Sequence, residues 1–180
     1  TLVGDLGLNN DIYNVYPALG SFYAQDNINF GGMILNFGLR LDYWFPGKYV
    51  DDAVQDTNVV TIPNEIRQSY IDNTYEWFNG SRFKARLSPR LGISHPVSDY
   101  QTLFFSYGHF SKWPKPQFVY AKLNPASAQS SFQKFGNPNL DPETTVAYEL
   151  DLKTQFTPND VLTVTAYYSV QIGRASCRER

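Results

Sequence analysis

The sequence MILNFGLRLDYW, residues 33–44, alternates between two kinds of side chain. Apolar residues occupy the odd positions from Met33 to Tyr43, whereas positions 36, 38, 40 and 42 hold Asn, Gly, Arg and Asp. A period of two residues is typical of a β-strand with one apolar and one polar face. The apolar face must meet either a protein core or lipid, and the rest of the chain decides between them.

The composition of this 180-residue chain excludes several classes of protein. The chain is 16% aromatic and 18% charged, and its formal net charge of −2 lacks the basic surplus that a nucleic-acid partner requires. No apolar run approaches the roughly 18 residues of a transmembrane helix. The chain opens without a methionine or a signal segment, so we expect an internal piece of a longer protein.

The last ten residues, QIGRASCRER at 171–180, break the alternation of the VLTVTAYYSV before them. They contain three arginines and the only cysteine of the chain, Cys177. This decapeptide resembles the translated read-through of a sequencing-library adapter, so we expect 171–180 to be a non-native tail; the alternative is a genuine disordered basic tail. On the first interpretation Cys177 is no candidate nucleophile or metal ligand.

Six segments carry strand patterning, and their connections alternate in length. The segments cover about 18–29, 33–44, 83–95, 101–110, 144–156 and 161–170. Short turns lie at 30–32, 96–100 and 157–160, whereas long loops cover about 46–82 and 111–143. Loops above about 15 residues are uncommon in compact soluble domains. Because they recur at every second connection, all long loops leave one end of the sheet, as in an outer-membrane barrel.

The faces of these segments and the positions of their aromatic residues favour lipid over a protein core. In 83–95, Leu87 and Leu91 share one side while Arg86 and Arg90 share the other. A soluble β-sandwich also alternates in this way, and it stays as an alternative. Aromatic residues at both ends of the apolar faces match the interfacial girdles of a barrel wall. These are Phe30 and Phe156 at the short-turn ends, and Tyr43, Phe83, Tyr107, Tyr148 and Tyr168 towards the long loops.

We therefore predict an all-β fold, an antiparallel up-and-down transmembrane β-barrel of which residues 1–170 supply an incomplete part with about six strands. Pro89 lies inside one of these strands and has no N–H to donate to a ladder. It predicts a bulge or an edge at that point.

Three stretches resemble the barrel of TonB-dependent outer-membrane receptors. They are YAQDNINFGGMILNFGLRLDY at 23–43, FKARLSPRLGISHPVSDYQTLFFSYGHF at 83–110, and FGNPNLDPETTVAYELDLKTQFTPNDVLTVTAYY at 135–168. The most recognisable motifs are SPRLG at 88–92, GNPNLDPETT at 136–145 and YELDLK at 148–153. They follow one another in the family's order over most of residues 18–170.

The resemblance implies a barrel of about 22 strands around an N-terminal plug, in the bacterial outer membrane. Such receptors import a scarce ligand (a siderophore, cobalamin, an oligosaccharide or a peptide) with energy passed on through TonB. The implied partners are outer-membrane lipid, the receptor's own plug and the TonB complex, the last two outside this chain. The alternatives are a passive porin or adhesin barrel and a soluble carbohydrate-binding β-sandwich. A plug encoded upstream would separate the receptor from the porin.

Two groups of residues are candidates for a site. Charged residues of the polar face are candidates for contact with the plug or a ligand path, although opposite charges could simply pair on a wetted wall: Arg40, Asp42, Arg86, Arg90, Glu149, Asp151 and Lys153. Aromatic residues of the long loops are candidates for stacking on a ligand, although they could instead pack the loops: Trp113, Phe118, Tyr120, Phe132, Tyr75 and Trp77.

Catalysis finds no support in the sequence. The acidic pairs Asp51 with Asp52, and Asp141 with Glu143, lie in or beside loops without a nearby histidine. His95 and His109 are isolated, and no spacing typical of metal ligands or of a phosphate-binding glycine loop occurs. We expect no enzyme activity, no metal and no cofactor.

Overall fold

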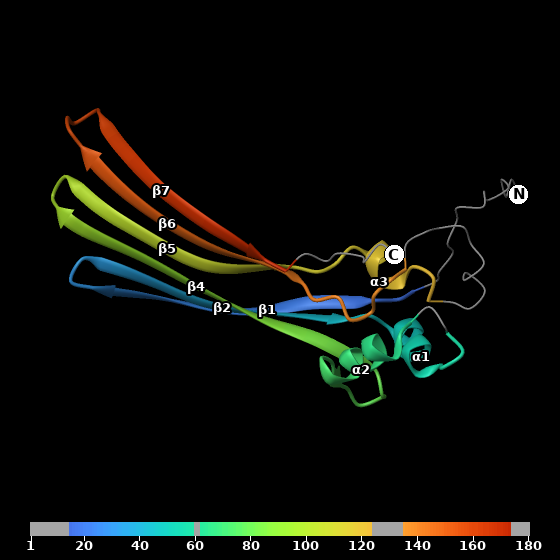
Figure 1. Cartoon of the computed structure of the whole chain (residues 1–180). Helices are drawn as coiled ribbons and strands as arrows, with labels where there is room; N and C mark the ends of the chain where they lie inside the picture. Colours follow the sequence, from blue (N-terminus) through green and yellow to red (C-terminus); the bar gives the residue numbers. More distant parts are fainter. Residues whose placement is uncertain (1–14, 60–61, 124–134, 174–180) are drawn as a thin grey trace, which may run out of the picture.

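The computed structural model describes residues 15–59, 62–123 and 135–173, and its main feature is one seven-stranded sheet. Six long strands and one short strand form this sheet (Figure 1). The long strands are β1 (Ala18–Phe30), β2 (Met33–Phe45), β4 (Arg82–Ser98), β5 (Gln101–Lys112), β6 (Glu143–Gln155) and β7 (Val161–Ile172), and the short one is β3 (Tyr75–Glu76).

The strands form an antiparallel meander in the order β1-β2-β4-β5-β6-β7, with β3 paired to β4 alone. The turn between β1 and β2 contains Gly31 and Gly32 at φ 58° and 84°, a left-handed conformation that side chains disfavour. In the described residues β1 and β7 each pair with one long strand, so the sheet is open. The predicted up-and-down all-β architecture is confirmed.

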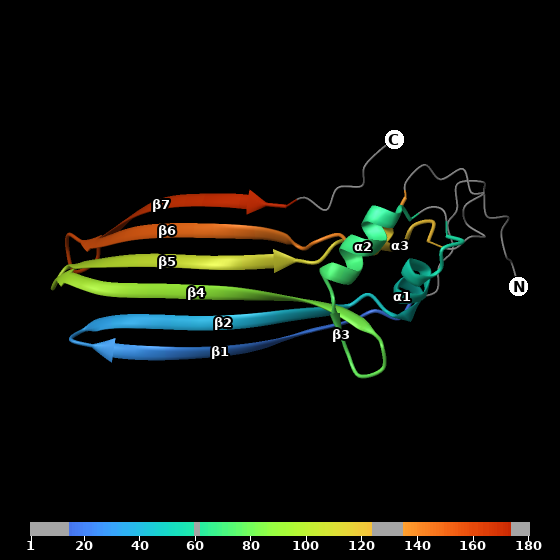
Figure 2. The same cartoon turned by 60° about the horizontal axis from the view of Figure 1, so that its bottom comes forward.

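Short turns lie at one end of the sheet and the long connections at the other (Figure 2). This confirms the predicted alternation of connections. The strand bounds also agree with the prediction to within a few residues, but β7 continues to Ile172, which pairs with Thr144. The predicted non-native tail at 171–180 overlaps the last two residues of β7, and its start stays a prediction. Residues 174–180 lie outside the described part of the chain, where the adapter interpretation stays a prediction.

The long strands divide between an apolar and a polar face, as the alternation predicted, with exceptions: Asp26 pairs with Phe37 on the apolar face, and Phe110 lies with Arg90 on the polar face. Register places Leu39 opposite Pro89 and Leu41 opposite Leu87 on the apolar face. This face is well exposed in the chain, with Leu150 at 45%. The ladder between β4 and β5 ends at Arg90, directly beside Pro89, which has no N–H to continue it. The edge predicted at Pro89 is therefore present.

The described parts of the long connections contain three helices that the sequence did not predict: α1 (Lys48–Gln55), α2 (Asn64–Asp72) and α3 (Pro116–Tyr120). They are too short to give a clear period, and helices of this length owe their stability to tertiary packing. None of the described helices is long and apolar enough to cross a membrane.

The helices and their connections form a cap at one end of the sheet (Figures 1 and 2). Trp44 of β2 is 4% exposed and lies in the cap core. Since Trp44 lies on the polar side of β2, the cap packs on the polar face. The cap core consists of Trp44, Val50, Ala53, Val54, Val59, Ile62, Tyr70, Val119, Tyr120, Leu123 and Leu140.

Candidate functional site

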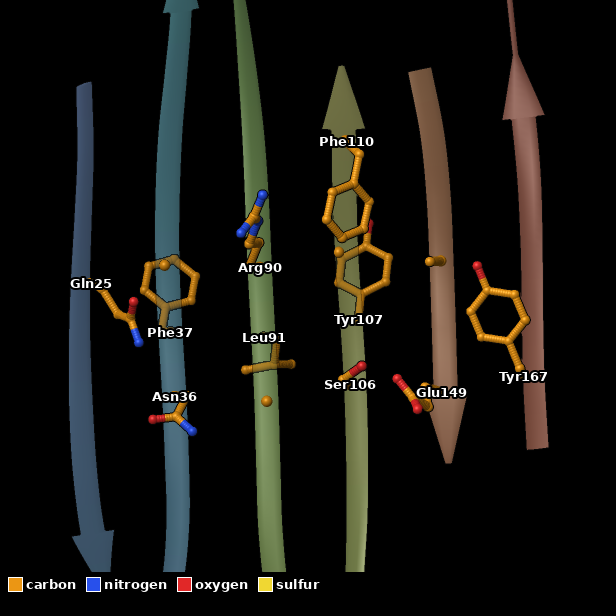
Figure 3. A pocket seen from close by; sticks show the side chains of 14 residues that line it. Gln25, Asn36, Phe37, Arg90, Leu91, Ser106, Tyr107, Phe110, Glu149 and Tyr167 are labelled. Carbon is orange, nitrogen blue, oxygen red and sulfur yellow. The ribbon is translucent and has the colours of Figure 1, made fainter. Parts of the chain in front are cut away.

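Members of two neighbouring rows of residues line a hollow on the polar face of the sheet (Figure 3). Strand register defines each row, because paired residues on successive strands lie side by side. The first row is Gln25, Gly38, Arg90, Gly108, Ala147 and Ser169. The second row is Asn27, Asn36, Gly92, Ser106, Glu149 and Tyr167.

The hollow, which we call the Arg90 hollow, has a volume of about 390 Å³. Small residues make its floor: Gly38, Gly92, Gly108 and Ala147 all line it. Its polar lining contains amides, a hydroxyl, a guanidinium and a carboxylate, from Gln25, Asn36, Ser106, Arg90 and Glu149. Such a lining offers both hydrogen-bond donors and acceptors to an occupant.

Arg90 lies between two glycines, since it pairs with Gly38 on one side and Gly108 on the other. Because glycine has no side chain, there is space on both sides of the aliphatic part of the Arg90 side chain. Its guanidinium lies over the ring of Phe110, 4.8 Å from the ring centroid. A Cβ added at Gly108 would lie 3.2 Å from that ring, so glycine permits the cation–π contact. Among the described residues Arg90 forms no ion pair, which leaves its donors to an incoming acceptor.

The predicted charges of the polar face divide into paired and open groups. Arg40 Nε lies 2.8 Å from Asp42 Oδ1, and Asp42 Oδ2 also accepts a hydrogen bond from Ser111 at 3.0 Å. This ion pair agrees with the alternative in which opposite charges on the polar face neutralise each other locally. Arg90 and Glu149 instead line the Arg90 hollow.

Arg86, Asp151 and Lys153 lie outside the Arg90 hollow. Arg86 pairs with Asp42 in the ladder, and Lys153 lies between Thr102 and Thr163 nearer the short turns. Asp151 Oδ1 is buried and accepts no hydrogen bond from the described part of the chain. A buried carboxylate oxygen without a donor is costly, and here the donor is lacking although Asp151 is paired on both sides, with Phe104 of β5 and Thr165 of β7.

The predicted loop aromatics of 111–136 belong to the cap. Trp113 lies 5.4 Å from Trp44 between ring centroids, and Phe118 packs against the cap core. Tyr120 is 1% exposed, and its hydroxyl donates to the carbonyl of Pro46 at 2.9 Å. Its burial leaves Tyr120 no surface to offer a ligand, so in this structure it packs the loop. Phe132 lies outside the described residues.

Tyr75 and Trp77, also predicted as ligand contacts, lie away from the other candidates. Both pack on Phe83, with ring centroids 5.5 and 5.9 Å away. Phe83 belongs to the apolar face, because its neighbour Lys84 points into the cap side and is 4% exposed. The structure thus separates these two residues from the Arg90 hollow by the thickness of the sheet.

A buried polar network that the sequence analysis missed holds the cap together. Arg67 donates to the carbonyls of Ile62 at 3.2 Å, Ala53 at 3.0 Å and Val59 at 2.6 Å, and also to that of Val54. These carbonyls lie at and beyond the C-terminal end of α1, where a cation is favourable. No local motif signals such a side chain, because its acceptors become neighbours only when the connection folds back.

A second part of this network joins the helices to β4. Tyr70 donates to Asp51 Oδ1 at 2.7 Å, and the Arg82 N–H donates to Asp51 Oδ2 at 3.3 Å. Burial raises the pKa of the Asp51 carboxyl above its ordinary value, an effect that these hydrogen bonds oppose. Burial, with the nearby Asp51 charge, also raises the pKa of Tyr70. Tyr70 therefore stays a protonated donor.

Lys84 anchors the GNPNLDPETT motif. Its ammonium donates to Asn139 O at 3.0 Å, Asn139 Oδ1 at 3.1 Å, Leu140 O at 3.2 Å and Asp141 Oδ1 at 3.0 Å. The motif's Gly136 lies so close to the 119–121 backbone that a Cβ would collide with the Val119 carbonyl. The motif thus ties the cap to the polar face of β4.

The described residues contain no group of three His, Cys, Asp or Glu side chains placed to hold a metal ion. The site is therefore an arrangement of hydrogen-bonding and charged groups on a wall, below a cap. The arrangement is suited to contact with another molecule or protein segment.

Comparison with protein families decides the class of this wall. The family model described as "TonB dependent receptor-like, beta-barrel" matches residues 4–173. The chain belongs to the TonB-dependent receptor β-barrel family. It is thus an outer-membrane protein. In barrels of this kind the apolar strand faces meet lipid and the polar faces line the lumen. No curated protein matches the chain.

Membership of the TonB-dependent receptor family supports receptor and transport roles in the bacterial outer membrane, and the family is one of transporters rather than enzymes. It also implies a plug and the TonB complex as general partners. In outer-membrane barrels the short turns are generally periplasmic and the long loops extracellular.

Proposed function

We propose that this barrel wall serves TonB-coupled uptake of a scarce ligand: a siderophore, cobalamin, an oligosaccharide or a peptide. The observation that carries the proposal is the Arg90 hollow, a polar recess with an uncommitted guanidinium on the lumen wall of a receptor-family barrel. A passive porin also has a polar lumen. A plugged receptor, however, needs specific contacts between wall and plug, and the hollow supplies a place for them.

The charges around the Arg90 hollow support a contact with the plug or with a ligand on its way past the plug. A guanidinium that lies over Phe110 is held flat and ready for bidentate contact with a carboxylate. Glu149 adds an acceptor on β6 of the same hollow. Asp151 Oδ1, buried without a donor among the described residues, supports the same interpretation, since a neighbouring segment would bring donors to it.

The cap supports an extracellular role above this lumen. Its own core and the Arg67 network hold together the described parts of the long connections, so ligand-contacting surfaces there are in place before binding. Trp113 and Phe118 lie partly exposed at the side of the cap, with Lys112, Lys115 and Glu143 around a second hollow of about 310 Å³. We infer that these aromatic and basic groups are the part of the cap that a ligand meets first.

The experiment uses the full-length receptor in a strain that lacks its own copy. Uptake is measured for a panel of radiolabelled ferric siderophore, cobalamin, oligosaccharide and oligopeptide. Deletion of TonB, or collapse of the proton gradient, should abolish uptake of the one compound transported. Uptake that continues by diffusion under both conditions would establish a passive porin instead.

A pair of matched variants then tests the Arg90 hollow. Arg90→Gln and Glu149→Gln should lower uptake while the barrel remains folded, as judged by its heat-modifiable migration in gels. Asp99→Asn, which neutralises one exposed carboxylate in a short turn, serves as the control and should transport normally. Normal uptake by both hollow variants would remove the Arg90 hollow from the mechanism while leaving the family assignment intact.

A further inference from the structure

A small aromatic hairpin projects from the cap side of β4. It consists of residues 75–83, in which Tyr75 pairs with Phe83 and Glu76 with Arg82. The Trp77 N–H donates to Ser81 O at 2.8 Å, and Gly80 takes φ 77° in the turn. In Figure 2 the turn of this hairpin extends away from α2 and α3. The tip is therefore a closed, ordered turn.

One face of the aromatic hairpin continues the lipid-facing wall. Trp44 and Lys84 point into the cap side and are each 4% exposed, so the adjacent Phe45 and Phe83 lie on the opposite face. Phe45 and Phe83 contact each other with centroids 5.2 Å apart. Trp77 packs on both, at 6.3 Å from Phe45 and 5.9 Å from Phe83.

The same ring contacts run from the hairpin onto the barrel strands. Phe45 contacts Tyr43 at 6.1 Å, and Tyr43 stacks on Phe22 of β1 at 5.7 Å. Tyr43 and Phe22 belong to the apolar face of β2 and β1. The hairpin's rings are thus continuous with the wall that meets lipid, at its extracellular end.

The other face of the aromatic hairpin is tied to the cap by polar contacts. Arg82 donates to Thr74 Oγ1 at 2.7 Å and to Ile71 O at 2.7 Å, and it lies 3.6 Å from Glu76. These bonds set the orientation of the hairpin. Its aromatic face consequently points away from the cap.

The aromatic side chains of the hairpin are exposed: Phe78 by 96%, Tyr75 by 64% and Trp77 by 52%. Three such rings in one short hairpin are a costly surface in water. Further strands of the barrel would extend the sheet at its edges beside β1 and β7, and they would not cover its outer face. Tyrosine and tryptophan are enriched where a membrane meets water, because their rings are amphipathic.

We propose that the aromatic hairpin is a membrane anchor of the cap, which inserts Trp77 and Phe78 into the interfacial region of the outer leaflet. Its occupant is the lipid surface beside the barrel, and it is no part of the ligand path. The anchor fixes the end of α2 relative to the bilayer through Arg82. This role is independent of which ligand the receptor transports.

The test places a nitroxide on the tip of the hairpin in the full-length receptor, in a cysteine-free background and reconstituted into lipid nanodiscs. Phe78→Cys carries the label at the proposed anchor. Leu150→Cys provides the lipid reference on the outer wall, and Glu65→Cys in the first turn of α2 provides the water reference. Electron paramagnetic resonance then measures collision rates with oxygen, which concentrates in lipid, and with a water-soluble nickel chelate.

The anchor predicts that the Phe78 label lies between the two references: it collides more often with oxygen, and less often with the chelate, than the Glu65 label does. Chelate collisions equal to those at Glu65 would place the tip in water and overturn the proposal. Protection from both reagents would show that protein covers the tip, and would also overturn it. A label at Tyr75→Cys repeats the measurement if the first variant fails to assemble.

Discussion

Trp44 and Trp113 contact each other with their ring centroids 5.4 Å apart. This contact joins the end of β2 to the connection that follows β5. Trp44→Ala should remove this contact and open a cavity in the cap core, at a cost of about 3–5 kcal/mol for a buried aromatic residue. The barrel ladder should survive, because its strands pair independently of the cap. Hydrogen–deuterium exchange of α1 and α2 in the full-length receptor measures the effect.

The neighbouring residue supplies the control for Trp44. Phe45→Ala also deletes a ring, but Phe45 lies on the opposite face against Phe83. It should leave exchange in α1 unchanged. Equal loosening of α1 by both variants would contradict the assignment of the two residues to opposite faces.

A charged substitution should destabilise the barrel strongly on the lipid-facing side of the wall and only slightly on the lumen side. Leu150→Lys places an ammonium on the outer face and should cost about 2–4 kcal/mol if the position lies near the bilayer centre. Asn36→Lys, in the Arg90 hollow, should cost far less because that face is wetted. The measurement is urea-induced unfolding of the full-length receptor in vesicles. Similar costs at the two positions would argue against the lipid assignment.

The cap should become more stable as the pH falls, through Asp51. Burial raises the pKa of this carboxyl above its ordinary value of 3.8, so the folded cap binds the proton more tightly than the unfolded chain does. The stabilising contribution of the protonated form is complete below 3.8 and is lost as the pH rises through the raised pKa. Acidification from neutral pH should therefore increase protection of α1 relative to an Asp51→Asn variant, which does not titrate.

This pH dependence is measured by hydrogen exchange in α1 and α2, corrected for the intrinsic exchange rate at each pH. The Asn variant is a suitable reference because its amide still accepts the Tyr70 hydrogen bond. If the difference in exchange protection between the two proteins stayed constant from pH 7 to about 4, burial would not raise the pKa of the Asp51 carboxyl. If acidification instead increased protection of the Asp51→Asn variant relative to the wild type, the predicted pH dependence would have the wrong sign.

Lys84 should hold the 137–142 segment in place. Lys84→Met keeps an apolar stem of similar length but leaves the buried carbonyl of Leu140 without its donor, at a cost of about 1–3 kcal/mol. Limited proteolysis of the full-length receptor should then cut within 137–142 sooner than in the wild type. Asp141→Asn is the control, because the Asp141 side chain is 74% exposed and its ion pair contributes little. Early cleavage in the Asp141 variant alone would contradict this account.

Much of the barrel wall was predictable because its information is local. Alternation in 33–44 predicted a strand with Leu39 and Leu41 on one face, and register confirms that they share it. Gly31 and Gly32 predicted the turn that the structure contains. The polar character of Arg90 and Glu149 was equally visible, since every second residue of a strand shares a face.

The cap residues were less predictable for a physical reason. Tyr120 and Trp77 are both aromatic residues in long loops, and composition gives them the same interpretation. The fold buries Tyr120 under Pro46 and places Trp77 on the outer face of the wall. The pairing of Tyr75 with Phe83 decides on which side of the sheet Trp77 lies. No local sequence pattern specifies a pairing of this kind.

The sequence by itself thus determined the six long strands, the two faces, the alternation of short and long connections, and the family. Those features follow from side-chain period and turn chemistry, which act between near neighbours in the chain. Only the tertiary structure decided the Arg90 hollow, the cap network around Arg67 and the outward orientation of the aromatic hairpin. Each of these requires residues from separate strands or loops to meet, and their meeting is set by ladder register and packing rather than by local sequence.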